Sequence, residues 1–309
     1  MSRDDNCTLL EIDQQLPGFH RFIGSWLYTG DINLIVDVGP ANSAQSLIHT
    51  LIDLDIDRID YVLLTHIHLD HAGGLSQFLE HFPMARVVCY DRGIKHLLEP
   101  SSLWEGSRKA LGEIAEGYGP PEPVKGEFFV PHTEAHIDGL QVIETPGHAI
   151  HHLSFTYRGN LFVGEAGGNY YSLKDTDYLR PATPPRFFME VFVNSVDKLL
   201  ALEDQHICYA HFGDATSSKQ MLRRFRTQVL RWKDLIRGEV TVGSDAIVER
   251  CVQRLLEKDL DLKAFSLMDT DTQAREKYFL SNSVKGYIGF LQKGNAIFTS
   301  PSILGSSTH

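Results

Sequence analysis

The sequence predicts an α/β domain followed by a helical C-terminal region, and three observations support this division. Apolar runs typical of buried strands alternate with amphipathic helical patterns between residues 43 and 90. Beyond Ala215, apolar residues recur at steps of three and four, as in a helix with one buried face. Of the 309 residues, 42% are hydrophobic and 22% charged, a balance that can build a packed core. The predicted units are residues 1–215 and 216–309.

The first forty residues predict short strands separated by glycine turns. These strands lie at residues 8–12, 19–23, 25–28 and 33–36. The last strand ends at Asp37, whose carboxylate could approach a metal site or accept backbone N–H bonds in its loop. We favour the loop role, because Asp in loops commonly bonds to nearby backbone.

The remaining elements follow from periodicity and from turn residues. Helices are predicted at 43–54, 75–81 and 188–202, and strands at 59–64, 86–90, 141–144, 153–157, 161–163 and 206–210. Residues 97–124 look less regular, and the Gly and Pro residues at 116–123 indicate a surface loop. In the C-terminal region, amphipathic helices are predicted around Phe225 and Cys251, and two more at 271–280 and 282–292.

Charge and cysteine usage exclude several classes of protein. A net charge of -11 and a pI near 5.7 argue against nucleic-acid or anionic-membrane partners, because phosphate binding needs clustered basic charge. No apolar run approaches the roughly 18 residues of a membrane span, and the first ten residues lack a secretory apolar region. The four cysteines form no C-x-x-C pair, so we expect reduced thiols and a cytoplasmic protein.

The stretch T-H-I-H-L-D-H, residues 65–71, concentrates potential metal ligands directly after a buried strand. His66 and His68 are two residues apart, so in an extended chain their imidazoles project to the same side. Asp70 and His71 are adjacent and need a backbone turn to converge. Imidazole and carboxylate together suit zinc, and also iron or manganese. The stretch therefore predicts two neighbouring metal positions.

Three later residues, His148, Glu165 and His211, each follow a strand-like run. With these, the chain resembles the metallo-β-lactamase fold superfamily over roughly residues 8–215. The matching features are H-x-H-x-D-H at 66–71, T-P-G-H at 145–148, glycine and a carboxylate at 164–165, and the strand-ending histidine at 211. The resemblance implies a four-layered αββα sandwich. The layout, with helices last, is most similar to the glyoxalase II and lactonase-like hydrolases.

The resemblance also implies the ligands of two divalent metal ions, most simply zinc, with iron or manganese as alternatives. One ion would be held by His66, His68 and His148, and the other by Asp70, His71 and His211. The residue at 165 would bridge both. A hydroxide shared by two metals can attack an ester-type carbonyl, which predicts a hydrolase of thioesters, lactones or related small molecules. The helical C-terminal region would cover the cleft and set specificity.

Several positions depart from the family pattern and leave alternatives open. Glu165 stands where Asp is usual, so it either bridges the metals or supports them from outside. His151 and His152 are interpreted as supporting or packing residues. Asp214 either orients His211 or caps its loop.

The candidate catalytic residues are Asp70, Tyr170 and Tyr171. In lactonase-like relatives a tyrosine in this region assists the substrate carbonyl, and a phenol near the metals could donate to a developing oxyanion. The two tyrosines could equally be ordinary cleft-lining residues.

Two rival functions share the same ligands. One is an iron-dependent oxidoreductase, which the complete second ligand set argues against. The other is a ligand-binding or signalling protein without turnover, which the change to Glu165 favours. A small-molecule substrate is the expected partner, and a homodimer stays open.

Overall fold

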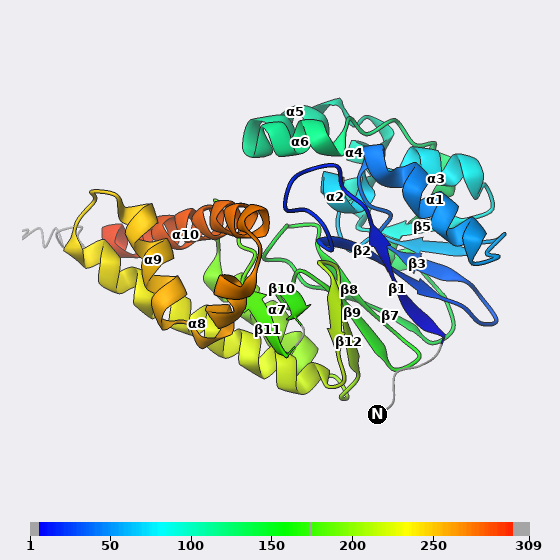
Figure 1. Ribbon diagram of the computed structural model, residues 1–309. Coiled ribbons are helices and arrows are strands. Elements are labelled where there is room, and N and C mark those ends of the chain that lie inside the picture. Colours follow the sequence, from blue (N-terminus) through cyan, green and yellow to red (C-terminus); the bar gives the residue numbers. More distant parts are fainter. Residues whose placement is uncertain (1–5, 174, 299–309) are drawn as a thin grey trace, which may run out of the picture.

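The computed structural model describes residues 6–173 and 175–298, and two stacked β-sheets form its centre (Figure 1). The first sheet has the order β1-β2-β3-β4-β5-β6. Its strands are β1 (Cys7–Ile12), β2 (Ile23–Tyr28), β3 (Leu34–Val36), β4 (Tyr61–Leu63), β5 (Arg86–Cys89) and β6 (Phe129–Pro131). β1 to β3 pair antiparallel, whereas β3 to β6 pair parallel. The parallel half brings the carboxyl ends of β3 and β4 together at one edge.

The second sheet has the order β13-β12-β9-β8-β7. Its strands are β7 (Leu140–Glu144), β8 (Leu153–Tyr157), β9 (Asn160–Gly164), β12 (His206–Tyr209) and β13 (Gly213–Ala215). β12 pairs parallel with β9, so the carboxyl ends of these two strands also meet. A separate antiparallel hairpin consists of β10 (Asn169–Leu173) and β11 (Thr176–Arg180).

The sheets pack face to face through alternate residues of their strands, as the two-residue period of a strand requires. One buried cluster lies between them and includes Trp26, Leu34, Val36, Leu63, Val88, Leu153, Phe155, Phe162 and Cys208. The intervening residues Ile35 and Val62 belong to the larger cluster beneath the helices. Across the interface, Trp26 Nε1 donates a hydrogen bond of 2.9 Å to Tyr209 O, which satisfies a buried donor.

Helices cover the outer faces of both sheets (Figure 1). On the first sheet lie α1 (Ala44–Asp53) and α3 (Leu75–His81), which bury Leu47, Leu51 and Phe78. On the second lie α7 (Met189–Leu200) and the start of α8 (Ser218–Val242), where Ser217 Oγ accepts from Gln220 N as the N-cap. The resulting αββα order confirms the predicted fold class.

The segment expected to be irregular, residues 97–124, is largely helical. It contains the end of α4 (Ile94–Leu98), then α5 (Ser101–Leu111) and α6 (Glu113–Tyr118). α5 buries none of its residues, and it carries a glycine at 106. Without a core-facing stripe, the periodicity that reveals a helix is weak. Short 3-10 turns elsewhere are η1 (Ala41–Ser43), η2 (Asp91–Gly93), η3 (Gly126–Phe128) and η4 (His132–Glu134).

The strand predicted at residues 19–23 is wrong, because β2 begins at Ile23. Its aromatic residues serve packing in a loop instead of pairing in a sheet. Phe19 and Phe22 meet edge to face with centroids 5.1 Å apart, and Phe22 stacks on Phe279 at 5.5 Å.

The C-terminal region consists of α8, α9 (Ile247–Lys258), the 3-10 helix η5 (Leu260–Leu267) and α10 (Thr270–Phe298). The two helices predicted at 271–280 and 282–292 are one continuous helix, α10. Ser281 does not interrupt it, because its hydroxyl donates 2.7 Å to Lys277 O inside the helix. Among the described residues, no helix is long and apolar enough to cross a membrane.

Buried polar contacts tie this region together. Asp259 is buried and accepts hydrogen bonds from Trp232 Nε1 at 2.6 Å and Gln228 Nε2 at 2.8 Å. The fully buried Glu276 of α10 accepts from Arg180 Nε of β11 at 2.5 Å. α10 is therefore fixed to the hairpin, and through it to the sandwich.

Candidate metal centre

The ligand stretch combines an extended segment with one helical turn. His66 and His68 precede α2 (Leu69–Ala72), which holds Asp70 and His71. The turn expected between the paired histidines and the Asp-His step is thus α2. His148 lies in the loop between β7 and β8, Glu165 follows β9, and His211 follows β12. The strand ends of both sheets deliver all seven residues to one edge of the sandwich.

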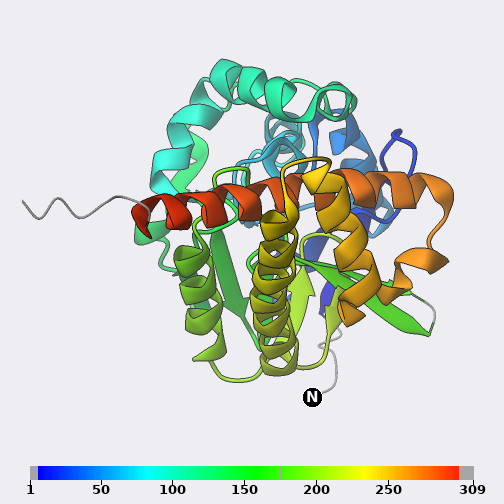
Figure 2. The same cartoon turned by 90° about the vertical axis from the view of Figure 1, so that its left-hand side faces the viewer.

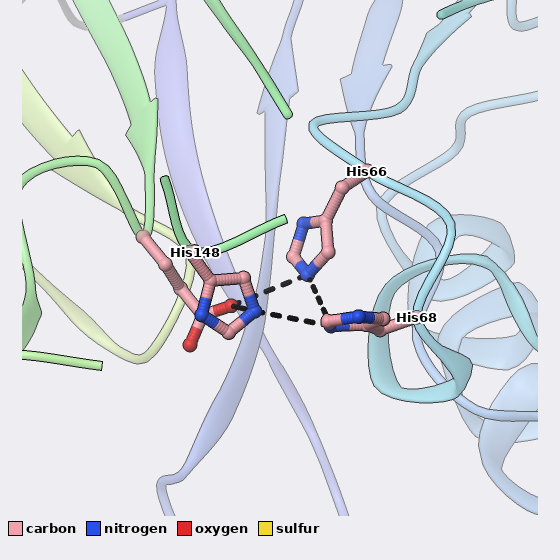
Figure 3. Close-up of side chains that lie close together, drawn as sticks. His66, His68 and His148 are labelled. Atoms are coloured by element: carbon pink, nitrogen blue, oxygen red, sulfur yellow. Dashed lines mark hydrogen bonds and ion pairs between the residues drawn. The ribbon is translucent and has the colours of Figure 1, made fainter. Parts of the chain in front are cut away.

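The first ligand group comprises His66, His68, His148 and Glu165, whose ligand atoms all lie within 4.8 Å of one another. Figure 3 shows the three imidazoles pointing toward a common centre. His68 Nδ1 lies 3.0 Å from both His66 Nε2 and His148 Nε2. Three imidazole nitrogens and a carboxylate form a donor set that suits zinc.

The second group comprises Asp70, His71 and His211. Asp70 Oδ2 lies 3.5 Å from His71 Nε2 and 3.6 Å from His211 Nε2. Both histidines are almost completely buried. His71 Nε2 has no hydrogen-bond partner among the described residues, although it is enclosed by protein. A buried ring nitrogen without a hydrogen-bond partner needs an explanation, and ligation of a metal ion supplies one.

Glu165 lies between the two groups. Its Oε2 is 2.7 Å from His148 Nε2 and 3.2 Å from His66 Nε2, whereas its Oε1 is 3.3 Å from His211 Nε2. Oε1 therefore faces the second group, whereas Oε2 lies nearest the first group and 3.8 Å from His71 Nε2 of the second. The extra methylene of glutamate does not keep the headgroup from a bridging position.

In His148 and His211, the ring nitrogen that faces away from the ligand groups shows which tautomer is present. His148 Nδ1 lies 3.0 Å from Ala182 O, and His211 Nδ1 lies 3.1 Å from Phe22 O. Carbonyl oxygens only accept, so both Nδ1 atoms carry the proton. The Nε2 lone pairs are then directed into the site, as in metal-bound histidines with an ordered outer contact.

Asp37 orients one histidine of each group. Its Oδ2 accepts from His71 Nδ1 at 2.9 Å and from Thr65 Oγ1 at 2.7 Å. Because that hydroxyl has donated its proton, Thr65 Oγ1 accepts from His66 Nδ1 at 3.0 Å. The expected backbone bond is also present, from Thr65 N to Asp37 Oδ1 at 2.8 Å. Loop capping is thus only part of the role of Asp37. Its φ of 59° is a strained backbone conformation of the kind that is common at functional positions.

The electrostatics of the cluster match the needs of a cation. Burial lowers the pKa of His66, and lowers that of His68 to about 3, so both are neutral at pH 7. Burial alone would raise the pKa of Glu165, but His148 and His211 hold it well below its usual range. Burial would lower the pKa of His71, yet Asp70 and Asp37 raise it. Protons on the histidines therefore balance the negative charge of the carboxylates. A bound divalent ion would supply that positive charge instead.

His151 and His152 lie outside the two ligand groups. His152 Nε2 accepts from Glu165 N at 3.0 Å, which fixes the backbone beneath the Glu165 carboxylate. Gly164 has a φ of +59°, and a Cβ there would lie 2.4 Å from His152 Nε2. Only glycine fits that close approach. His151 lines the cavity described below.

The three remaining sequence candidates lie away from the ligands. Tyr171 is buried, and its hydroxyl accepts from Arg275 Nη2 at 2.9 Å, while Tyr170 stacks on Tyr209 with centroids 4.9 Å apart. Neither tyrosine lines the cavity. Asp214 Oδ2 contacts His206 Nε2 at 2.8 Å, so the proposed orientation of His211 by Asp214 is wrong. Phe22 O has that role.

A cavity of about 640 Å³ opens directly above the ligands. Its floor includes His68, Asp70, His148, Glu165 and His211. One wall is α5 and the other is α10 with the loop at 182–185. Figure 2 shows α10 crossing the molecule beneath the arch of α4, α5 and α6. Tyr118, at the end of α6, also lines the cavity. No sequence motif distinguishes Tyr118, because it precedes a glycine in a segment expected to be a loop.

Comparison with known proteins agrees with this geometry. A family model described as the metallo-beta-lactamase superfamily matches residues 21–211. A metallo-beta-lactamase fold-containing protein of Sulfurisphaera tokodaii is 27% identical over 213 residues, 64% of this chain and 77% of its own length. A hydroxyacylglutathione hydrolase of Photobacterium profundum is 27% identical over 289 residues, 87% of this chain and 98% of its own length.

A solved structure shares the fold over almost the whole chain. The metallo-beta-lactamase family protein of Thermus thermophilus aligns with a TM-score of 0.66, at 18% sequence identity. The alignment covers 96% of each chain, including the helices that follow the sandwich.

Proposed function

Because this chain belongs to the metallo-β-lactamase superfamily, we propose that it is a binuclear metal-dependent hydrolase. The substrate is a small molecule with an ester-type bond: a thioester, a lactone or a related ester. The observation that supports this most directly is the position of Glu165, whose carboxylate lies between the two ligand groups and contacts histidines of both. The complete second group favours a hydrolase over the iron-dependent oxidoreductase.

We propose zinc as the ion in both groups, with iron or manganese as the alternatives that the same ligands accept. His66, His68 and His148 hold the first ion, and Asp70, His71 and His211 hold the second. Ions held there supply Lewis acidity and ionise water at neutral pH.

The chain contributes orientation and exclusion of water. Asp37 and the carbonyls of Phe22 and Ala182 fix the imidazoles, so little reorganisation is needed when charge develops. The Phe22 ring packs on His211 with centroids 4.5 Å apart and closes one side of the floor. A dry, preorganised floor strengthens every electrostatic contact made with the substrate.

The test combines metal analysis with a panel of esters, thioesters and lactones. We expect two divalent ions per chain and turnover of at least one substrate class, which His68→Ala abolishes and His49→Ala preserves. His49 is exposed on α1 and has no part in the site. Purified protein that binds no transition metal, even after zinc, iron or manganese is added, would overturn the proposal.

A further inference from the structure

The walls of the cavity differ from its floor in chemistry. On α5, the residues that line the cavity recur at steps of three and four, and so form one face of the helix. They are Ser102, Leu103, Gly106, Ser107, Ala110 and Leu111. The charged residues of α5 lie elsewhere, and Arg108 pairs with Glu116 at the exposed surface. α5 therefore presents a mostly apolar face to the cavity.

The opposite wall also offers a substrate few charged side chains. It is formed by Phe279, Asn282 and Ser283 of α10, with Pro184 and Pro185 from the loop. Among the described residues that line the cavity, Arg180 is the sole cation other than histidine. It is 1% exposed and its Nε donates to Glu276 at 2.5 Å, while its Nη2 has no hydrogen-bond partner among the described residues. Along these walls an anionic group on the substrate would thus meet a single buried guanidinium, whose charge Glu276 already balances.

We propose that the substrate carries an uncharged, apolar acyl or alkyl group, which lies between α5 and α10 while its ester-type bond meets the floor. This inference rests on the proposed function and narrows its substrate class. It also separates this chain from hydrolases of glutathione thioesters, because the glutathione moiety carries two carboxylates that need cationic partners. Burial of apolar surface against these walls supplies the binding free energy.

The first test compares acyl chain lengths on the metal-loaded protein. For p-nitrophenyl esters from acetate to octanoate, we expect kcat/KM to rise about 3- to 4-fold for each methylene that becomes buried. The thioester S-lactoylglutathione should be a poorer substrate than the hexanoyl ester. A kcat/KM independent of acyl length, together with a preference for the glutathione thioester, would overturn the inference. Turnover of no ester, thioester or lactone would instead overturn the proposed function.

A binding measurement tests the walls without turnover. We expect 2-decanone, an uncharged ketone, to bind the metal-loaded protein in calorimetry. The Ala110→Glu variant, which places a carboxylate on the cavity face of α5, should weaken that binding at least 10-fold. Ala201→Glu makes the same change at an exposed position directly after α7 and should leave it unaltered. Equal binding by both variants would contradict the proposed location.

A different observation assigns a role to Tyr118. Its side chain is 1% exposed, and its hydroxyl has no hydrogen-bond partner among the described residues. It lines the same cavity as Asp70 and Glu165. Asn42 Nδ2 donates to Gly117 O at 3.0 Å and secures the chain beside the ring. A buried hydroxyl without a partner carries a desolvation penalty, which a bound ligand can remove.

We infer that the Tyr118 hydroxyl donates a hydrogen bond to an oxygen of the substrate as negative charge develops there. Burial and the nearby Asp70 carboxylate keep the pKa of Tyr118 well above its ordinary value, so the phenol retains its proton. Tyr118 therefore replaces Tyr170 and Tyr171 as the candidate catalytic phenol. This role also rests on the proposed function.

The test is Tyr118→Phe, with Tyr209→Phe as its control. Tyr209 also has a buried hydroxyl without a hydrogen-bond partner among the described residues, but it does not line the cavity. We expect Tyr118→Phe to lower kcat about 100-fold, as loss of an oxyanion donor does, with unchanged metal content and no loss of thermal stability. Tyr209→Phe should keep kcat within 2-fold. If an active wild type and both variants share one kcat, the inference is wrong.

Discussion

The floor and the walls of the cavity are built in opposite ways. Every histidine of the two ligand groups except His68 has a second contact that fixes its ring, and the ligands follow the ends of β-strands in both sheets. The α5 wall has no buried residue. For the proposed hydrolase, we therefore expect the sandwich to set the chemistry and the added helices to set the choice of substrate.

The largest expected effect comes from the centre of the floor. Glu165→Gln keeps the size of the side chain but removes the charge that faces both ligand groups. We expect hydrolysis to fall by about 10²- to 10⁴-fold, and the metal content to fall from two ions toward one. Activity assays and metal analysis measure both. Glu80→Gln, at an exposed position on α3, is the control, and similar values for the two variants would break the proposed division of roles.

A large effect on stability is expected where α10 joins the hairpin. Glu276 is fully buried and contacts both Arg180 and Arg275, so Glu276→Gln leaves buried positive charge without compensation. We expect a loss of about 3–5 kcal/mol in the free energy of unfolding. Asp197→Asn, which breaks the exposed pair with Arg226, should cost no more than about 1 kcal/mol. Urea denaturation distinguishes them.

The floor also predicts how the metal-free chain responds to acid. The folded pKa of His68 lies near 3, below its unfolded value, so the unfolded state takes up the proton first. Its contribution to stability is therefore complete above pH 6.5 and is lost progressively as the pH falls toward 3. Between pH 6.5 and 4.5 we expect His68→Asn to lose about 2 kcal/mol less stability than the wild type. His49→Asn should behave like the wild type in the same titration.

A smaller effect is expected from the carboxylate beneath the floor. Asp37→Asn retains the shape of the side chain but weakens its bonds to His71 and Thr65. We expect the affinity for metal to fall about 10- to 100-fold, as is typical when an outer partner of a ligand is lost. Competition with a chelator measures this. The matched change at the exposed Asp57 should leave the affinity unchanged.

The smallest effect is expected from alanine at a glycine of α5, where the effect on stability can be separated from the effect on substrate preference. A Cβ at Gly106 meets no atom within 4 Å, and the same is true at Gly238 of α8. Alanine at either helical position should raise the free energy of unfolding by about 0.5–1 kcal/mol. Only Gly106→Ala places its methyl on the cavity face, so only this variant should change the acyl-length profile. Identical profiles would show that this face of α5 does not meet the substrate.

The sequence predicted the floor far better than the walls, for a physical reason. Metal ligation needs particular residue types at fixed spacings, so residues 66–71 and the later strand-ending histidines could be recognised locally. The strands of the sandwich were visible because burial on both faces produces continuous apolar runs. Helix α5 has no fully buried residue that would mark a stripe. Ser281 suggests a break in the sequence, whereas in α10 its hydroxyl bonds within the helix.

Individual side chains were missed for a related reason. The role of Asp37 depends on parallel pairing between β3 and β4, which sets its carboxylate beside Thr65. The choice of Tyr118 over Tyr170 and Tyr171 depends on which hydroxyl lacks a partner, and that follows only from the packed structure. Long-range arrangement decides such roles, whereas motif spacing does not.

The absence of buried residues on α5 also bears on how the molecule moves. The apolar side chains of α5, Leu103, Trp104 and Leu111, are only partly buried, so displacing this helix exposes less apolar surface than unfolding the sandwich does. The free energy of local opening is therefore below that of global unfolding. Amide hydrogens of α5 should therefore exchange with solvent much sooner than those of β4 or β9. A substrate can then enter through brief openings of this arch, while the strands that carry the ligands stay closed.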